Sequence, residues 1–207
     1  MDGLLPSEDG RKAAILSYLA WEFSKAGVRA ALEVSYPVAL AKRVIEFAFV
    51  GLTEKPFDRI SLVRLLSPMS NRAQLFTSLT WTEEDYGVAD LGVVLPKCGD
   101  LPPEVIVQKL PTVLEYIRAN SESGKSGSAS VAYISNLAKI SEALENVLPL
   151  VVEPGRLQRN AEKMREYYGR NFEVDTGSGY IEDGNHRALA TILATGKESI
   201  RAFVGRV

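Results

Sequence analysis

The segment that most constrains how this chain can fold lies near its C-terminus, at residues 179–190 (GYIEDGNHRALA). A short apolar and aromatic stretch ends in two carboxylates and a glycine, and an apolar helical pattern follows at once. This order predicts a strand, a tight turn and then a helix over residues 185–194. The free N–H groups and the dipole at a helix N-terminus attract anions. Because Asn185, His186 and Arg187 lie at that position, we expect a binding or catalytic site there.

The remaining patterns predict an α+β chain in two regions. Apolar residues recur at helical or alternating spacing in several segments. Helices are expected over 12–25, 38–50, 57–66, 71–79, 103–119, 131–148 and 157–168, and strands over 150–152, 172–174, 180–182 and 200–204. Pro111 predicts a kink or a break in its helix, and Gly27, Gly51 and Gly196 are expected helix ends. We expect a mainly helical, unassigned region at 1–130, packed with a small module of mixed sheet and helix at 131–207.

Composition excludes several classes of protein. The apolar share of 46% is that of an ordinary globular chain, and the net charge of −2 argues against a surface coated with basic residues. Cys98 is the only cysteine, so an intramolecular disulfide framework and a cysteine-rich zinc site are excluded. The N-terminus does not resemble a signal peptide, and the apolar stretch 38–52 is short and interrupted by charges. We expect no membrane insertion and a cytoplasmic location.

The linker-like stretch 121–130 contains a fragment of a phosphate-binding motif. Gly124-Lys125-Ser126 matches the end of a P-loop, which also needs a glycine where Ala119 stands and a preceding strand. A helical pattern precedes it instead. We therefore favour a flexible surface loop.

The turn at 182–187 carries the residues that phosphate chemistry needs. Glu182 and Asp183 alternate on the strand, so one of them faces a ligand, and Asp183 is the closer to the turn. Either carboxylate is a candidate catalytic base, and Asp183 is also a candidate ligand for a divalent cation. Gly184 permits close backbone approach and Arg187 supplies a cation. His186 is a candidate acid/base group or phosphate donor.

Each of these residues also has a purely structural interpretation. Asp183-Gly184 is a common turn pair, and Asn185 is a common helix N-cap. Arg187 has Glu182 and Glu153 as candidate surface partners. The glycine-rich turn at 176–179 is more simply a hairpin turn than a second phosphate site.

Possible DNA contacts are suggested by the helical pattern ahead of the motif. Arg156, Arg159 and Lys163 share one face and are candidates for contact with the DNA backbone. Glu162 and Glu166 are interleaved with them, which is typical of a solvated helix face.

The sequence from residue 180 onward resembles the ParB/sulfiredoxin superfamily. The shared features are a strand, an Asp-Gly-x-x-Arg turn, an alanine-rich helix, a glycine and the alternating segment 200–204. The resemblance covers residues 151–207, and residues 1–130 carry none of this kind. Sulfiredoxin-like members have a reactive cysteine where this chain has Asn185, which disfavours sulfinic-acid reduction.

The resemblance implies a nucleotide-handling protein. Gly184 would lie against a phosphate and Arg187 would clamp it, with Asn185 and His186 at the variable positions between them. ATP or ADP and Mg²⁺ or another divalent cation are the implied cofactors. The leading hypothesis is an ATPase or nuclease, of the kind found among plasmid-encoded accessory proteins that inhibit DNA transfer. Two alternatives remain open: a kinase for a small metabolite such as free serine, and a non-catalytic regulator that binds DNA, or a protein partner through its helical region.

Overall fold

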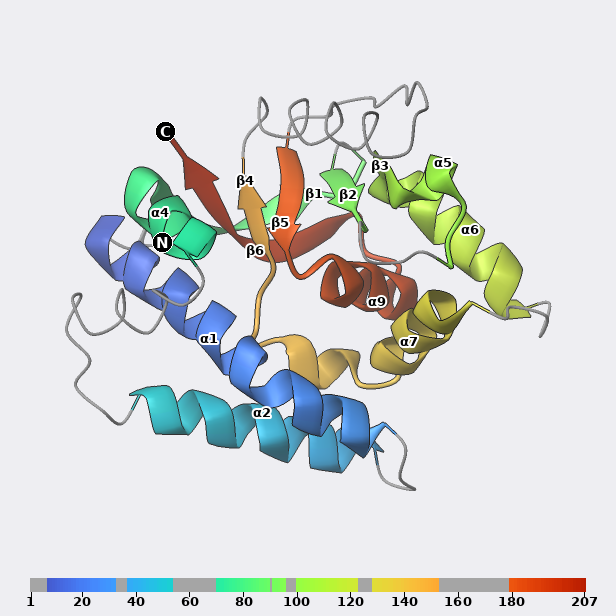
Figure 1. The fold of residues 1–207 in the computed structure, drawn as a ribbon, viewed down its shortest axis with the longest axis horizontal. Coiled ribbons are helices and arrows are strands. Elements are labelled where there is room, and N and C mark those ends of the chain that lie inside the picture. Colours follow the sequence, from blue (N-terminus) through green and yellow to red (C-terminus); the bar gives the residue numbers. More distant parts are fainter. Residues whose placement is uncertain are drawn as a thin grey trace.

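The fold is α+β, with helices packed around one mixed sheet (Figure 1). The computed structural model describes residues 7–32, 37–53, 70–89, 91–95, 100–122, 128–152 and 179–207. Its helices are α1 (Ser7–Ala31), α2 (Pro37–Thr53), α4 (Ser70–Ser78), α5 (Pro103–Ile106), α6 (Leu110–Glu122), α7 (Ala129–Ala138), the 3-10 helix η1 (Ser141–Leu144) and α9 (Asn185–Thr195). Its strands are β1 (Thr80–Gly87), β2 (Leu91–Val94), β3 (Val107–Lys109), β4 (Leu150–Val152), β5 (Gly179–Asp183) and β6 (Ser199–Arg206).

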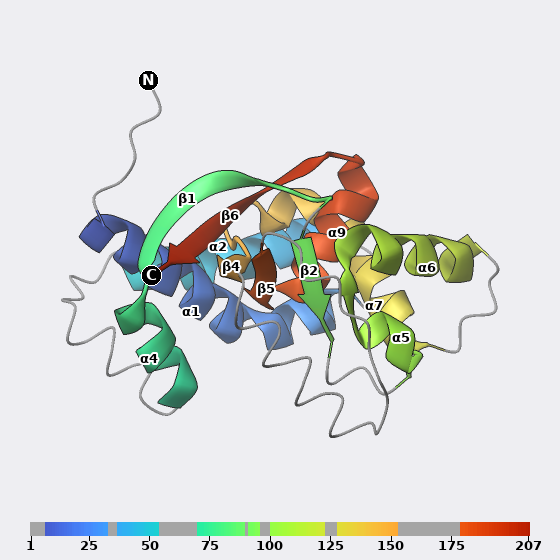
Figure 2. The same cartoon turned by 90° about the horizontal axis from the view of Figure 1, so that it is seen from above.

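The sheet combines strands from both halves of the chain in the order β1-β6-β4-β5-β2-β3. β1 and β6 pair antiparallel over their whole lengths and form the long curved pair in Figure 2. β4 lies parallel to β6 and antiparallel to β5, and β5 lies parallel to β2. The strands β1, β2 and β3 come before residue 130, and β4, β5 and β6 come after it. The regions 1–130 and 131–207 therefore share one sheet.

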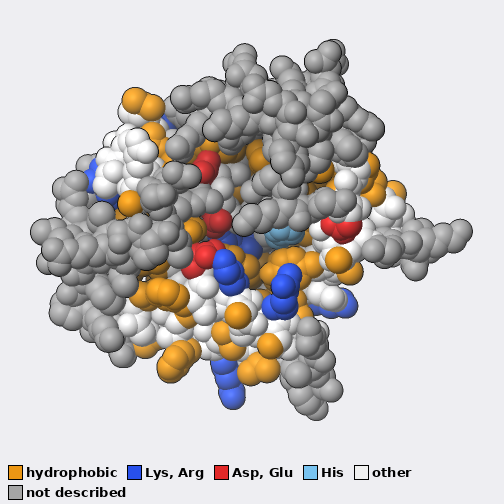
Figure 3. All heavy atoms as spheres, viewed as in Figure 1, with side chains coloured by type: hydrophobic (Ala, Val, Ile, Leu, Met, Phe, Trp, Pro, Cys, Tyr) orange, Lys and Arg blue, Asp and Glu red, His pale blue; other side chains and the backbone are white. Residues whose placement is uncertain are grey.

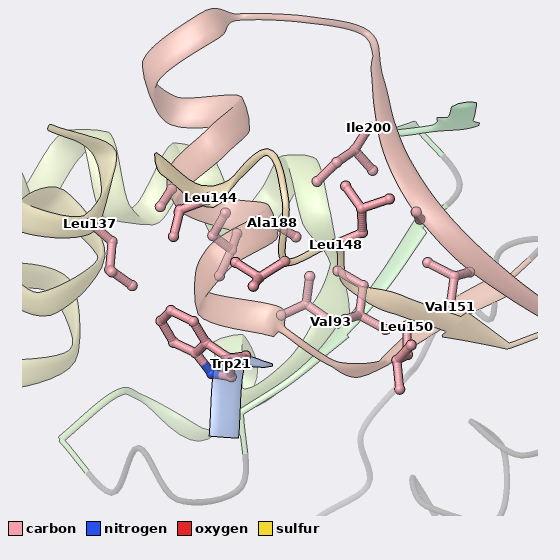
Figure 4. Packing of buried hydrophobic residues seen from close by; sticks show 14 of the residues in the cluster. Trp21, Val93, Leu137, Leu144, Leu148, Leu150, Val151, Ala188 and Ile200 are labelled. Carbon is pink, nitrogen blue, oxygen red and sulfur yellow. The ribbon is translucent and has the colours of Figure 1, made fainter. Parts of the chain in front are cut away.

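The helices bring the N-terminal part of the chain to the C-terminal motif. α1 and α2 lie side by side, and α7 packs against α9 (Figure 1). α1 also packs closely on β1, since a Cβ at Gly10 would lie 2.0 Å from the carbonyl oxygen of Trp81. Figure 4 shows Trp21 of α1, Leu137 of α7 and Ala188 of α9 within the same apolar core. The surroundings of the motif are therefore built partly by the first helix.

Most of the expected elements are confirmed. The expected helices at 12–25, 38–50, 71–79 and 185–194 correspond to α1, α2, α4 and α9, and the expected strands at 150–152, 180–182 and 200–204 to β4, β5 and β6. Gly196 ends α9 in the left-handed conformation, with a φ of 65°. In contrast, Gly27 and Gly51 lie within α1 and α2, so the prediction that they end those helices was wrong. Packing of the two helices against each other offsets the modest cost of an internal glycine.

Two predicted long helices are broken in the structure. Residues 103–119 form α5, the strand β3 and the first part of α6, because β3 pairs with β2. The break expected at Pro111 is confirmed, since α6 begins at Leu110; Pro111 lies in the first turn of this new helix, where its missing N–H is tolerated. The predicted helix at 131–148 ends at Ala138 and is followed by η1.

The acidic segment at 83–85 lies in β1, a strand that its polar sequence did not predict. Two ion pairs across the ladder, Glu83 with Arg201 and Glu84 with Arg206, offset its charge. The predicted helices at 57–66 and 157–168, the strand at 172–174 and the P-loop fragment at 124–126 lie outside the described residues. Among the described helices, none is long and apolar enough to cross a membrane.

Candidate functional site

The predicted strand–turn–helix is present, and Gly184 makes its turn. β5 ends at Asp183, Gly184 adopts the left-handed conformation with a φ of 90°, and α9 begins at Asn185. A Cβ at Gly184 would lie 2.7 Å from Nη2 of Arg187 and 3.0 Å from Cα of Pro149. A guanidinium therefore occupies the space beside this glycine.

Asn185 ties the turn to the neighbouring strand. Its Oδ1 accepts a hydrogen bond from the backbone N–H of Val94 at 3.0 Å, and its Nδ2 donates to the carbonyl of Ile181 at 3.3 Å. The N-cap of α9 is Gly184, so the interpretation of Asn185 as the N-cap was wrong. Asn185 instead satisfies the N–H of β2 at the point where the strand ends, which fixes the start of α9 relative to the sheet.

Arg187 is buried inside the molecule. Its side chain is 2% exposed, and its Nη2 donates to Oδ2 of Asp183 at 2.9 Å. The guanidinium lies over the ring of Trp21, with Cζ 4.4 Å from the ring centroid, in a cation–π contact. Burial lowers the pKa of Arg187, and the charge of Asp183 opposes that shift. The alternative in which Arg187 forms a surface pair with Glu182 is wrong, and Glu153 lies outside the described residues.

Two nitrogens of this guanidinium lack an acceptor among the described residues. Nε and Nη1 of Arg187 are shielded from solvent and have no hydrogen-bond partner there. A buried donor left without an acceptor costs about 1–3 kcal/mol, and more when the group is charged. Native proteins rarely tolerate this without a functional reason or a bound partner. This is the chemically most unusual feature of the site.

His186 lies beside Arg187 and contacts α7. Its ring packs edge-on against Tyr133, with 5.5 Å between the centroids, and Arg29 of α1 lies over the Tyr133 ring. Burial is the main cause that lowers the pKa of His186, and the positive charge of Arg187 adds to it. The imidazole is therefore neutral at neutral pH and can accept a proton. Figure 3 shows the histidine, in pale blue, between side chains of both charges.

The two adjacent carboxylates have different environments. Glu182 accepts a hydrogen bond from the hydroxyl of Tyr180 at 2.5 Å, on the same face of β5. Asp183 forms the ion pair with Arg187. Among the described residues, no group of three or more His, Cys, Asp or Glu side chains is arranged to hold a metal ion.

A third carboxylate fixes the start of α7 near His186. Asp100 accepts hydrogen bonds from the Ser128 hydroxyl and from both the backbone N–H and the hydroxyl of Ser130. Partial burial favours a higher pKa for Asp100, but these hydrogen bonds outweigh it and lower the pKa to about 2. Asp100 therefore stays ionised, and its charge partly offsets the lowering of the His186 pKa.

The structure brings residues 182–187 together as the sequence predicted and adds residues that the sequence did not indicate. These are Trp21 and Arg29 of α1 and Tyr133 of α7. The helical pattern of α1 indicates that Trp21 is buried, but no sequence signal connects it with Arg187. The candidate DNA-contacting residues Arg156, Arg159 and Lys163 lie outside the described residues.

Comparisons with protein-family models, with curated proteins and with solved structures find no match for this chain.

Proposed function

We propose that this chain binds a nucleotide phosphate at the N-terminus of α9, through Arg187, His186 and the first backbone N–H groups of the helix. The supporting observation is the buried guanidinium whose Nε and Nη1 lack an acceptor among the described residues. A phosphate oxygen is the acceptor that best fits two guanidinium N–H groups. The helix N-terminus adds its dipole at the same place.

Binding is expected to involve a local rearrangement. Arg187 is 2% exposed, so a phosphate reaches its free nitrogens only if neighbouring side chains move. The ring of Trp21 lies directly over the guanidinium. Its fluorescence should therefore change when the site fills.

We propose further that the site hydrolyses the bound phosphate ester, as the resemblance to the ParB/sulfiredoxin superfamily implies. Neutral His186 would accept a proton from water as the water oxygen attacks phosphorus and the bond to the leaving group breaks. Arg187 would stabilise the charge on the phosphoryl oxygens, and Asp183 would hold the guanidinium in place. A divalent cation at Asp183 would share that carboxylate with Arg187. Activity on a nucleotide corresponds to an ATPase, and activity on a DNA phosphodiester to a nuclease. In the alternative of a free-serine-like kinase, the hydroxyl of a metabolite attacks phosphorus in place of water.

One observation favours a second candidate, a non-catalytic module that keeps the motif for folding. The ion pair with Asp183 and the contact with Trp21 give Arg187 a structural role even with the site empty. In this case the chain would act by binding DNA or a protein partner.

Titration of the full chain with phosphate, ADP and ATP separates the two candidates. Calorimetry and tryptophan fluorescence measure binding with and without Mg²⁺, and ATPase and DNase assays measure turnover. The variants are His186→Gln and Arg187→Lys, with exposed Lys197→Gln as the control. Binding that weakens in Arg187→Lys, with turnover lost in His186→Gln, supports the enzyme. Wild-type chain that binds none of the three ligands overturns the phosphate site.

Binding without turnover keeps the phosphate site and overturns the proposed hydrolysis, whereas absence of both binding and turnover supports the non-catalytic module. A chain that phosphorylates serine or a related metabolite in the presence of nucleotide supports the kinase.

A further inference from the structure

The outward face of α2 is apolar in a way that a solvated helix face is not. The opposite face packs into the molecule through Ala41, Ile45 and Leu52. On the outward face, Phe47 is 83% exposed and Leu40 is 42% exposed.

The exposed residues recur at the spacing of a helix-packing seam. Counted along α2, the outward positions fall in four groups, at 39–40, 43, 46–47 and 50–51, which repeat every three or four residues. They are Ala39, Leu40, Arg43, Glu46, Phe47, Val50 and Gly51. Two of the seven are charged, with opposite charges, and a third charged residue, exposed Lys42, lies at the side of this set. Small residues, Ala39 and Gly51, lie near the two ends and permit close approach of another backbone.

We infer that this face is the interface of a homodimer, in which α2 packs antiparallel against α2 of a second copy about a two-fold axis near residue 45. In this register Leu40 lies opposite Val50 of the second copy. Arg43 lies opposite Phe47 and next to Glu46, and two-fold symmetry makes each contact twice.

Charge complementarity selects the second copy and this orientation. Antiparallel packing joins each Arg43 to a Glu46 and to an aromatic face, which are both favourable contacts. Parallel packing would place Arg43 against Arg43 and Glu46 against Glu46, which is repulsive. Lys42 lies within 4.0 Å of Glu46 on the same helix, at the side of the seam. A single helix pair is a small interface, so the dimer is expected to be weak and to depend on concentration.

Analytical ultracentrifugation of the full chain, from about 1 to about 500 µM, tests this inference. We expect a reversible monomer–dimer equilibrium in the wild type. Phe47→Glu should raise the dimer dissociation constant about a hundredfold, because it places two charges in the apolar seam. Arg43→Glu should raise it about thirtyfold, because two attractive pairs become repulsive.

The charge swap and a matched control make the test specific. Arg43→Glu/Glu46→Arg should restore dimerisation to within about threefold of the wild type, since the antiparallel pairs are regenerated. Lys12→Glu changes the net charge by the same amount as Arg43→Glu, but at an exposed position on α1. It should leave the monomer–dimer equilibrium unchanged. The inference is overturned if the wild type is monomeric throughout. It is equally overturned if Phe47→Glu and Arg43→Glu dimerise as well as the wild type. Neither substitution touches the site at α9, so these results do not depend on whether the chain binds phosphate.

Discussion

Replacement of Gly184 by alanine should be among the most damaging single-methyl additions to this protein. The residue has a φ of 90°, where side chains are rarely accommodated. The added Cβ would also lie 2.7 Å from Nη2 of Arg187 and 3.0 Å from Cα of Pro149. The guanidinium cannot easily move away, since it is buried and paired with Asp183. The Pro149 contact is with backbone.

Gly196 provides a control that separates backbone strain from this contact. It also has a positive φ, 65°, but no described atom lies within 4 Å of its Cβ position. Alanine in the left-handed region costs about 1–2 kcal/mol, and the smaller conformational freedom of the unfolded chain recovers about 0.4–1 kcal/mol. Gly196→Ala should therefore lower the free energy of unfolding by about 1 kcal/mol. Gly184→Ala should lower the free energy of unfolding by about 2 kcal/mol more than Gly196→Ala does, which is the typical cost of overpacking.

Urea denaturation of both variants measures this difference directly, and thermal melting gives a second estimate. For a chain of this length, about 2 kcal/mol corresponds to a melting temperature about 4–8 °C lower. The tryptophan fluorescence of Gly184→Ala should also change, because displacement of Arg187 disturbs its contact with Trp21. Equal losses in the two alanine variants would refute the argument that Gly184 is needed to make room for the guanidinium.

Three further predictions concern the ionisable groups of the site. Asp183→Ala should lower the free energy of unfolding by about 3 kcal/mol, because it leaves Arg187 buried without its counterion. In urea denaturation the loss should be smaller for Asp183→Ala/Arg187→Met, and equal losses would exclude the ion pair as its cause. The pKa of His186 is lowered in the folded chain. The residue therefore contributes stability when the pH is above 6.5, the usual pKa of histidine, and this contribution is lost as the pH falls toward the folded pKa. Stability curves of wild type and His186→Gln should therefore diverge below about pH 6.5, and curves that stay parallel would contradict a lowered pKa. Asp100→Ala should lower the melting temperature by about 2–4 °C at neutral pH by releasing the start of α7. Since the pKa of Asp100 is lowered to about 2, the difference between variant and wild type should shrink as the pH falls from 3.8 toward 2, and a constant difference would argue against its hydrogen bonds to Ser128.

Local patterns were sufficient where neighbouring residues decide the conformation. Apolar spacing predicted α1, α2 and α9, and the glycine at position 196 predicted where α9 ends. Such signals failed where a distant strand decides the outcome. Residues 80–87 have the polar sequence of a loop, yet they form β1 because β6 supplies hydrogen-bond partners and two arginines. Residues 107–109 interrupt a helical pattern because β2 pairs with them.

Local sequence is enough to place Asp183, Gly184, His186 and Arg187 at one strand-to-helix turn. These residues are close along the chain, and the spacing of turn and helix leaves them little freedom to separate. Tertiary packing, in contrast, sets the inward direction of Arg187, its ion pair with Asp183 and its contact with Trp21. That outcome depends on α1 packing over the turn. Contacts between segments so far apart in the sequence are set by core packing and by the need to neutralise a buried charge, and neither has a local sequence signature.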